Sequence, residues 1–407
     1  MFKKRFAAVL GVAALGASSL SFIGSGAASA ARHSTHKTPA AATKSPYIVG
    51  DDWDSTTASS AYTDVTEKTL QLAITLLNES GGVNGHPIKL VFGNDESDPT
   101  KTPAVVEQLV NAGAKFLLMN EGVSYAGKPT IQKLKVPALG VTDVVPLLAS
   151  PPDDTYTYLL ASQLADWDTV YCAAFKKLGY KTVGILRDDS ATTAGLDDIL
   201  FPPLQKCVNV VDIETAPGAS TDLTSYVARL QAKNPQVILV ADLGGPFEIL
   251  AMTDIHNAMP NEPRWSLATI VNEPSTWTLA AKGVLNGVVA MGGLDPANKQ
   301  TQALDAILKK HYGANYQMSV FDANAWDAVQ IMKDAMLKAG SNNPIAVNNA
   351  LQSPHKVLAA FGQPGYELTY NKQKHSGANG LCGLVLEQFT ANNTPSKAFA
   401  GYQPTCS

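Results

Sequence analysis

Apolar residues recur along the chain in two alternating rhythms. Short apolar runs, such as YIVG from residue 47 and KFLLMN from residue 115, have the length and composition of buried strands. Between them, apolar positions at three- and four-residue spacing, as in residues 61–80, predict amphipathic helices. A strand followed by a helix, repeated many times, indicates parallel sheets whose crossovers are helices.

The alternation of strand and helix patterns is interrupted near Pro151 and Pro152, and it then continues as a second series of similar size. Two long helical patterns follow at residues 299–313 and 321–340. The C-terminal part has the pattern of strands joined by a turn-rich loop. The sequence therefore predicts two α/β domains of comparable size.

Three glycines, Gly81, Gly82 and Gly85, follow a predicted helix and precede a predicted strand. A dinucleotide-binding fingerprint needs the opposite order, a strand that leads through the glycines into a helix. We expect Gly81 and Gly82 to end the helix in left-handed conformations, which glycine adopts without strain. We expect Asp98 and Pro99 to start the next helix as its N-cap and first residue. The stretch is interpreted as scaffold.

Residues 1–30 have the composition of a secretory signal peptide. MFKKRF is basic, the following run is apolar and rich in small residues, and ASA before Ala31 fits the cleavage pattern. A transmembrane anchor is the alternative, although Ser and Gly interrupt the apolar run. Residues 31–45 are polar and aperiodic and are typical of a flexible leader. We therefore expect an extracytoplasmic protein, located in the periplasm, in the cell envelope or in the medium.

The charge balance narrows the choice of partners. The formal net charge is −4, and removal of Lys3, Lys4 and Arg5 with the signal peptide makes the chain more acidic. A mildly acidic exported protein is a poor match for nucleic acid or for an anionic membrane surface. We expect neither as a partner.

Four cysteines remain in the expected mature chain: Cys172, Cys207, Cys382 and Cys406. An even number in an oxidising compartment favours disulfides. Their order along the chain favours Cys172 with Cys207 and Cys382 with Cys406, although four cysteines permit three connectivities.

The stretch NESGGVNGHPIKLVFGNDESDP, residues 78–99, resembles a motif of the type I periplasmic binding proteins. The resemblance is to the branched-chain amino-acid (Leu/Ile/Val) class of solute-binding proteins for ABC transporters. The positions that fit are Asn78, Gly81, Gly82, Gly85, Ile88, Leu90, Asp95, Asp98 and Pro99. Looser agreement in KLGYKTVGILRDD, NPQVILVAD, NGVVAMGG and NAWDAVQIMKDAMLKAG extends the likeness over roughly residues 46–390.

The resemblance implies an α/β fold of two Rossmann-like lobes joined by a three-segment hinge, called periplasmic binding protein-like I. We expect lobe 1 to take residues 46–157 and 288–350, and lobe 2 to take residues 158–287 and 351–407. The resemblance also implies that the protein captures a small polar ligand, an amino acid or a related compound, in the cleft between the lobes. It would act as a monomer and deliver the ligand to the permease of an ABC importer. A ligand-sensing receptor domain of the same fold is the alternative.

Candidate ligand-binding residues of lobe 1 follow the ends of strands, where open α/β sheets bind ligands. Ser124 opens a predicted helix, and its hydroxyl and the nearby amides suit a carboxylate, with ordinary N-capping as the alternative for Ser124 and Thr142. In the resembling family the matching Ser contacts the α-carboxylate of the amino acid. The Thr that matches Thr142 contacts the α-amino and carboxylate groups, and Gly140 matches a residue that supplies a backbone contact.

Trp53 is a candidate wall for the ligand, with simple packing as the alternative. Asp51, Asp52 and Asp54 crowd its loop more than the family pattern does. They either favour a cationic group on the ligand or are solvated surface acids.

Lobe 2 departs further from the family pattern. Thr192 stands where a Tyr is common, and the Glu that binds the ammonium group in the family falls near Asn272 or Glu273. Phe247 is a possible side-chain wall. These differences are compatible with an amino acid as the ligand and leave its identity open, and a larger, a polar or a non-amino-acid ligand is the alternative.

A secreted hydrolase is the enzymatic alternative, and the sequence argues against it. GVSYAG approaches the nucleophile elbow G-x-S-x-G, but Ala126 occupies the position of the second glycine. The seven histidines are scattered, and His86 follows the glycine turn, where we expect a surface residue. The sequence also lacks histidines or clustered acids at the spacing of metal ligands. We expect no enzyme activity, no metal and no cofactor.

Overall fold

The structure is a computed structural model. It describes residues 43–57, 59–120, 122–190, 193–194, 199–242, 244–267, 269–395 and 398–405, and all of them belong to one compact unit. The expected signal peptide and residues 31–42 of the expected leader lie outside these ranges, so both stay predictions. Within the described ranges, no helix is long and apolar enough to span a bilayer.

The first sheet has five parallel strands in the order β2-β1-β3-β4-β5. Its strands are β1 (Tyr47–Asp52), β2 (Ile88–Gly93), β3 (Leu117–Met119), β4 (Ala138–Gly140) and β5 (Thr157–Leu159). The connecting segments are α1 (Ser60–Glu79), α2 (Thr102–Asn111), η1 (Ser124–Gly127), α3 (Lys128–Leu134) and η2 (Pro146–Ala149). The alternation expected from the sequence is confirmed here.

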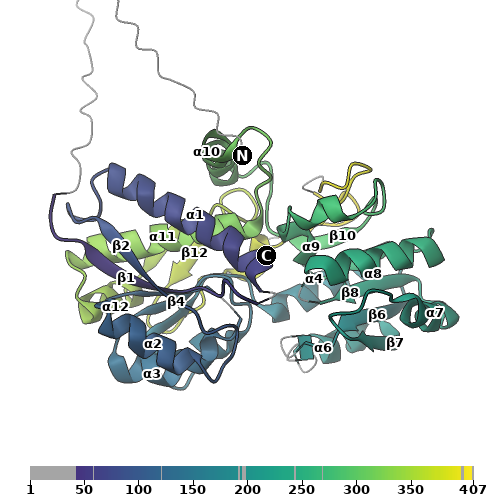
Figure 1. Cartoon of the computed structure of the whole chain (residues 1–407), viewed down its shortest axis with the longest axis horizontal. Helices are drawn as coiled ribbons and strands as arrows, with labels where there is room; N and C mark the ends of the chain where they lie inside the picture. The colour runs from purple at the N-terminus through teal and green to yellow at the C-terminus, as the bar shows by residue number, and fades with distance from the viewer. Residues whose placement is uncertain are drawn as a thin grey trace, which may run out of the picture. The chain divides into compact units, whose positions relative to one another are not determined.

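Helices cover both faces of this sheet, as Figure 1 shows for α1 and α11 on one side and α2 and α3 on the other. Successive strand residues point to opposite faces. Leu118 and Leu139 pack into the core that includes α1 and α11, whereas Leu117 and Ala138 pack into the core that includes α2 and α3. Because both faces are buried, the inner strands β3 and β4 contain only apolar residues and glycine, which explains the continuous apolar runs in the sequence.

The second sheet has six strands in the order β13-β10-β9-β8-β6-β7, and only β13 is antiparallel to its neighbour. Its strands are β6 (Thr182–Asp188), β7 (Asn209–Ala216), β8 (Val237–Ala241), β9 (Arg264–Ser266), β10 (Val289–Gly292) and β13 (Val385–Gln388). The accompanying helices are α4 (Leu164–Leu178), α6 (Phe201–Cys207), α7 (Thr224–Ala232), α8 (Gly245–Ala258), α9 (Thr269–Asn272) and η3 (Thr276–Leu279). Val183 and Leu239 face α4 and α6, while Ile238 and Val240 face α7 and α8.

The remaining elements pack against the first sheet. They are α10 (Lys299–Tyr312), α11 (Val320–Ala339), α12 (Pro344–Gln352), β11 (His355–Leu358) and β12 (Glu367–Tyr370). The segment η4 (Gly380–Gly383) follows them and contacts α4. Helix α11 packs along α1. It begins with a capping box, in which the Ser319 side chain and the Asp322 side chain each bond the other's backbone N–H.

The boundaries of the lobes differ from the expected ranges in two places. Strand β10 pairs with β9 and β13 in the second sheet, although residues 288–350 were expected in lobe 1. Residues 351–379 were expected in lobe 2, but β11 and β12 share the core of the first sheet, and the Tyr370 hydroxyl donates to the Leu159 carbonyl at 3.1 Å. Hereafter the first lobe is the five-stranded sheet with its helices and α10 to β12, and the second lobe is the six-stranded sheet with its helices.

The chain passes between the two lobes three times, after β5, after β10 and before β13. Two lobes of parallel-sheet α/β structure with three connecting segments confirm the fold expected from the resemblance.

The glycine turn has the scaffold role expected of it. Gly81 and Gly82 have positive φ angles of 105° and 66°, and a Cβ on Gly82 would lie 2.1 Å from the His86 carbonyl oxygen. The Asn78 side chain bonds both the N–H and the carbonyl of Ile88, which ties the end of α1 to β2.

The predicted start of α2 at Asp98 and Pro99 is wrong, because α2 begins at Thr102. The Asp98 carboxylate instead accepts from the Thr100 N–H at 2.9 Å, which closes a turn before the helix.

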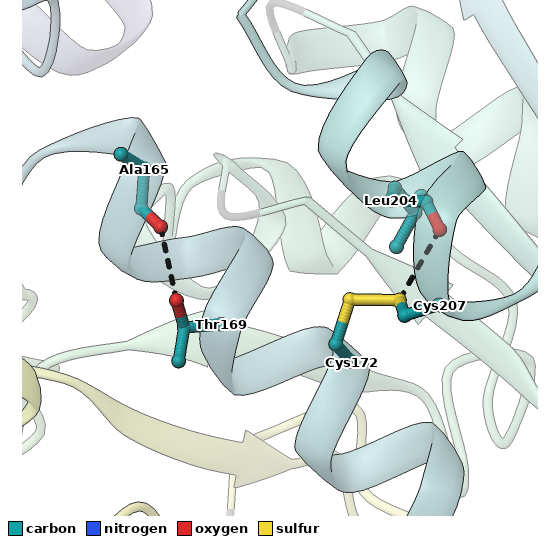
Figure 2. Close-up of a disulfide and its surroundings, with 5 residues drawn as sticks. All are labelled: Ala165, Thr169, Cys172, Leu204 and Cys207. Carbon is teal, nitrogen blue, oxygen red and sulfur yellow. Dashed lines mark hydrogen bonds between the residues drawn. A yellow bond between two sulfur atoms is a disulfide. The ribbon is translucent and has the colours of Figure 1, made fainter.

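A disulfide joins Cys172 of α4 to Cys207 at the end of α6, as predicted, with the two Cα atoms 5.7 Å apart (Figure 2). It links two helices that lie on the same face of the second sheet. None of the three described cysteines has a free thiol. Cys406, the predicted partner of Cys382, lies outside the described residues, so that pairing stays a prediction.

Candidate functional site

A cavity of about 340 Å³ lies beyond the carboxyl ends of strands from both sheets. The first lobe contributes residues that follow β3, β4 and β5, and the second contributes residues at the ends of β8, β9 and β10. All three connections between the lobes also line it, through Ser162, Gly292 and Gly383 among others. This is the position at which open α/β sheets bind ligands, and the volume suits a small organic molecule.

Five aromatic residues line the cavity; Phe361 is buried, and the other four, Tyr62, Tyr125, Trp167 and Phe321, form what we call the aromatic wall. Each is only partly buried. Tyr62 comes from α1 and Phe321 from α11, and their ring centroids are 5.4 Å apart. Tyr125 comes from η1, and Trp167 comes from α4 of the second lobe. The lining is therefore mainly apolar and is assembled from both lobes.

Two adjacent polar residues, Thr142 and Asp143, line the cavity just after β4. One carboxylate oxygen of Asp143 accepts from the Val145 N–H at 2.8 Å. Its second oxygen and the Thr142 hydroxyl are buried and have no hydrogen-bond partner among the described residues. Burial raises the pKa of Asp143 to about 8. These atoms have lost contact with water and have gained no partner among the residues that the structure describes.

The second lobe contributes Asp242 after β8 and Asn272 at the end of α9. The Asp242 carboxylate accepts from the Gly244 N–H at 3.1 Å, and the side-chain amide oxygen of Asn272 accepts from the Val320 N–H at 3.3 Å. The second of these bonds links the second lobe to the start of α11. Next to the lining, Glu273 accepts from the Gly245 N–H at 2.7 Å, and burial raises its pKa to about 8.

The ionisable groups in the described lining of the cavity are all acids. Asp143 and Asp242 are acids, and no Lys, Arg or His belongs to the lining formed by the described residues. Lys128 touches the neighbouring η2 segment, where its ammonium donates to the carbonyl oxygens of Leu147 and Ser150, but it does not line the cavity. Within the described ranges, no group of three or more His, Cys, Asp or Glu residues is placed to hold a metal ion.

Comparison with known proteins decides the family. Residues 50–379 match the family model described as periplasmic binding protein. This chain belongs to the periplasmic binding protein family. The resemblance inferred from residues 78–99 is thereby confirmed.

Curated relatives of this periplasmic binding protein are similar over most of their length. Leu/Ile/Val-binding protein homolog 3 of Brucella melitensis is 23% identical over 336 residues, which cover 76% of this chain and 84% of that protein. Leu/Ile/Val-binding protein BraC3 of Rhizobium johnstonii is 25% identical and covers 75% of this chain, with 83% of its own length matched.

Solved structures show the same fold. The substrate-binding protein LivJ of Streptococcus pneumoniae, solved with isoleucine, superposes with a TM-score of 0.70 at 17% identity, over 86% of this chain and 98% of LivJ. A solute-binding protein of Rhodopseudomonas palustris, solved with benzoate, gives a TM-score of 0.72 at 15% identity, over 88% of this chain and 98% of that one. At such identities the likeness establishes the fold.

Of the eight candidate ligand-binding residues, two line the cavity of this periplasmic binding protein: Thr142 and Asn272. Two more are adjacent in sequence to lining residues. Ser124 is buried between Val123 and Tyr125, and Glu273 is buried next to Asn272.

Three other candidates lie outside the lining and have packing contacts that account for them. The Trp53 indole N–H donates to Asp64 at 3.0 Å, and its ring meets Phe92 edge-on at 6.0 Å. A Cβ on Gly140 would lie 2.7 Å from a methyl carbon of Leu159, so close strand packing favours glycine there. Phe247 is buried in the core between α7, α8 and the second sheet. Thr192, the remaining candidate, lies outside the described residues.

The crowded acids beside Trp53 are not solvated surface groups. Asp51 and Asp52 are fully buried at the end of β1. Burial, and next the neighbouring charge of Glu67, raises the pKa of Asp51 well above its ordinary value. Burial, and next the charge of Asp95, raises the pKa of Asp52 to about 8. Neither Asp51 nor Asp52 lines the cavity.

Sequence reasoning missed Asp143, Asp242 and the aromatic wall. The rule that ligands bind beyond strand ends led to Thr142 but not to Asp143, the residue directly after it. Tyr62 and Phe321 begin helices far apart in the chain, and only the packing of α1 along α11 brings their rings together. No local pattern signals such a pair.

Proposed function

We propose that this protein captures a small organic solute in the cavity between its lobes and delivers it to an ABC importer outside the cytoplasm. The observation that carries the proposal is a cavity lined from both lobes, and from all three connections between them, in a member of the periplasmic binding protein family. Relatives named as Leu/Ile/Val-binding proteins and a neighbour solved with isoleucine support an amino acid or a related compound as the solute.

Capture follows from the shared lining. A solute that contacts both lobes binds more tightly when the lobes approach each other, and its differential affinity shifts the population toward the closed form. The Asn272–Val320 hydrogen bond is one contact that such closure makes or breaks. The closed form is then the one that the permease recognises.

The residues proposed to hold the solute are Thr142, Asn272, Asp143 and Asp242, together with the aromatic wall. Ser124 and Glu273 would support this set from positions next to it. We further propose that residues 1–30 direct export, that the mature protein is a monomer, and that its partner is the permease of the importer.

Thermal-shift screening of the mature chain tests the capture step. Amino acids, aromatic acids and amines are screened, because a ligand present at one hundred times its dissociation constant adds about 2.7 kcal/mol to stability. Phe321→Ala in the aromatic wall should weaken binding of any hit by tenfold or more. Leu337→Ala is the matched control, since this residue lies on the same helix with 45% of its surface exposed.

Two outcomes would count against the proposal. A hit that binds Phe321→Ala as tightly as wild type would place the ligand outside this cavity. A library without any hit would contradict solute capture. For the delivery step, deletion of the gene should abolish uptake of the same compound by intact cells, and unchanged uptake would contradict a role in import.

A further inference from the structure

We propose that the solute is an organic cation, whose charged head lies against Asp143 and whose apolar body lies against the aromatic wall. The inference rests on the proposed function and narrows it to a class of ligand. Three independent observations carry it: the rings of the wall, the sign of the charges in the lining, and the unpartnered polar atoms beside β4.

The aromatic wall suits a cation with an apolar body. Ring faces carry a negative quadrupole that attracts ammonium and related groups, and several rings around one space form a cage for them. Tyr62, Phe321 and Tyr125 belong to the first lobe and Trp167 to the second, so a ligand in contact with all of them bridges the lobes. The same rings provide apolar surface for the rest of the molecule.

The charged groups favour the same class. Asp143 on the first lobe and Asp242 on the second are acids on opposite sheets, and no Lys, Arg or His belongs to the described lining. Other titratable groups of this lining are the phenols of Tyr62 and Tyr125. Lys128 bonds backbone carbonyls of the neighbouring η2 segment. An anion would meet acids and ring faces without a countercharge in the lining.

Asp143 and Thr142 supply the geometry for the charged head. One oxygen of Asp143 is held by the Val145 N–H, which fixes the carboxyl group, while the other oxygen and the Thr142 hydroxyl have no partner among the described residues. A primary ammonium group brings three N–H donors and satisfies both atoms at once, and any organic cation, quaternary ones included, is attracted by the charge of the ionised carboxylate. A ligand carboxylate brings acceptors alone and would depend on the proton of Asp143 to be held there.

The two kinds of ligand are separated by the direction of their pH dependence. Burial raises the pKa of Asp143 to about 8 in the free protein, so its carboxyl is largely protonated at neutral pH. A bound cation stabilises the ionised form, and binding then releases a proton. Affinity for a cation should therefore increase as pH rises toward 8, by up to about tenfold per pH unit, and level off above it. Affinity for an anion should decrease over the same range.

The experiment compares matched probes by isothermal titration calorimetry on the mature chain at pH 6, 7 and 8. Phenethylamine and benzyltrimethylammonium are the cations, 2-phenylethanol is the neutral analogue, and 3-phenylpropionate is the anion. Benzyltrimethylammonium does not titrate, so its pH dependence reports the protein alone. Both cations should bind at least tenfold more tightly than the other two probes, and benzyltrimethylammonium should bind more tightly at pH 8 than at pH 6.

Asp143→Asn is the decisive variant. Asn keeps the oxygen that accepts from Val145 and cannot ionise, so the variant should fold, lose tenfold or more in affinity for benzyltrimethylammonium, and lose the pH dependence. Asp153→Asn is the charge-matched control, because Asp153 is exposed and does not line the cavity. Retention of wild-type affinity and pH dependence by Asp143→Asn would overturn the role of Asp143.

The remaining outcomes separate this inference from the proposed function. If 3-phenylpropionate binds as tightly as phenethylamine, or if isoleucine or benzoate binds and neither cation does, the cationic class is overturned while solute capture stands. If isoleucine, benzoate and all four probes fail to bind, the inference and the proposed function both fall.

Discussion

Two groups of buried acids lie at the carboxyl edge of the first sheet, and they differ in what surrounds them. At the end of β1, Asp51 and Asp52 neighbour Glu67 and Asp95, and all four side chains are almost fully buried. Beyond β4, Asp143 is equally buried, but its pKa is raised by burial alone and it lines a cavity. The acids at β1 repel one another inside packed protein, whereas Asp143 has lost water at a place that a ligand can enter.

The comparison shows that a raised pKa by itself does not locate a binding site. Asp52 and Asp143 both have a pKa of about 8, and both lower the stability of the folded protein as pH rises. Both carboxyl groups have buried oxygens without a hydrogen-bond partner among the described residues, so what distinguishes Asp143 is the cavity that it lines. Substitutions at the two places should therefore agree in their effect on folding and differ in their effect on binding.

The largest expected effect is the pH dependence of folding at Asp52. Its pKa rises from 3.8 in the unfolded chain to about 8 in the folded protein, so between these pH values the folded state holds a proton that the unfolded state has released. The stability contributed by this proton is complete below pH 3.8 and is lost as pH rises to about 8, at about 1.4 kcal/mol per pH unit. Asp52→Asn should remove this loss. Urea denaturation at pH 5 and pH 8 measures the free energy of unfolding of variant and wild type. If this free energy changes by the same amount between the two pH values in both proteins, the assignment is contradicted.

A second prediction concerns Asp322, a buried acid that is surrounded by donors. Its carboxylate accepts from Tyr316 at 2.8 Å and from the Ser319 N–H at 2.8 Å, and it also accepts from Thr69. Asp322→Ala would leave these donors without their acceptor and remove the capping box of α11. The free energy of unfolding should therefore fall by about 2–3 kcal/mol at neutral pH. Asp322→Asn keeps an acceptor oxygen and should cost much less. Urea midpoints at pH 7 compare the two, and equal losses would show that the hydrogen bonds contribute nothing.

The same edge of the first sheet shows how much of the fold could be predicted from the sequence. The alternating pattern predicted both α/β lobes, and the glycine turn was correctly interpreted, because period and turn chemistry are local. The start of α2 was misplaced because the carboxylates of Asp95 and Asp98 bond the backbone of a preceding turn and delay the helix. The position of β10 was missed because strand pairing across a crossover is set by the whole sheet.

The candidate site was harder to predict than the fold, for a physical reason. Thr142 and Asn272 line the cavity because the ends of parallel strands meet at one edge, which is a general rule. Trp53 and Phe247 matched a composition expected near a ligand, yet an aromatic side chain packs equally well in a core. The aromatic wall depends on contacts between distant segments, and these follow from packing that no single stretch encodes.

A third prediction tests whether Asp143 and Asp52 differ in their effect on ligand binding. Asp143→Asn should weaken benzyltrimethylammonium binding by tenfold or more at pH 8, whereas Asp52→Asn should change it by less than twofold, because Asp52 does not line the cavity. Both variants should shift the pH dependence of urea unfolding in the same direction, since both remove a group whose pKa is raised to about 8. Titration calorimetry and urea unfolding on the same samples separate the two effects. Equal losses of affinity would remove the distinction between the two groups of acids.

The smallest change in the free energy of unfolding is expected for the substitution of an exposed acid. Glu367 of β12 pairs with Lys356 of β11 at 2.9 Å, and the two side chains are 40% and 67% exposed. Water and salt screen such a pair, so Glu367→Gln should change the free energy of unfolding by less than about 0.5 kcal/mol. The change should shrink further in 0.5 M NaCl. A loss of stability as large as that of Asp322→Ala would show that the contribution of an acid to stability does not depend on its exposure. The contrast between the packed acids at β1 and Asp143 in the cavity would then lose its physical basis.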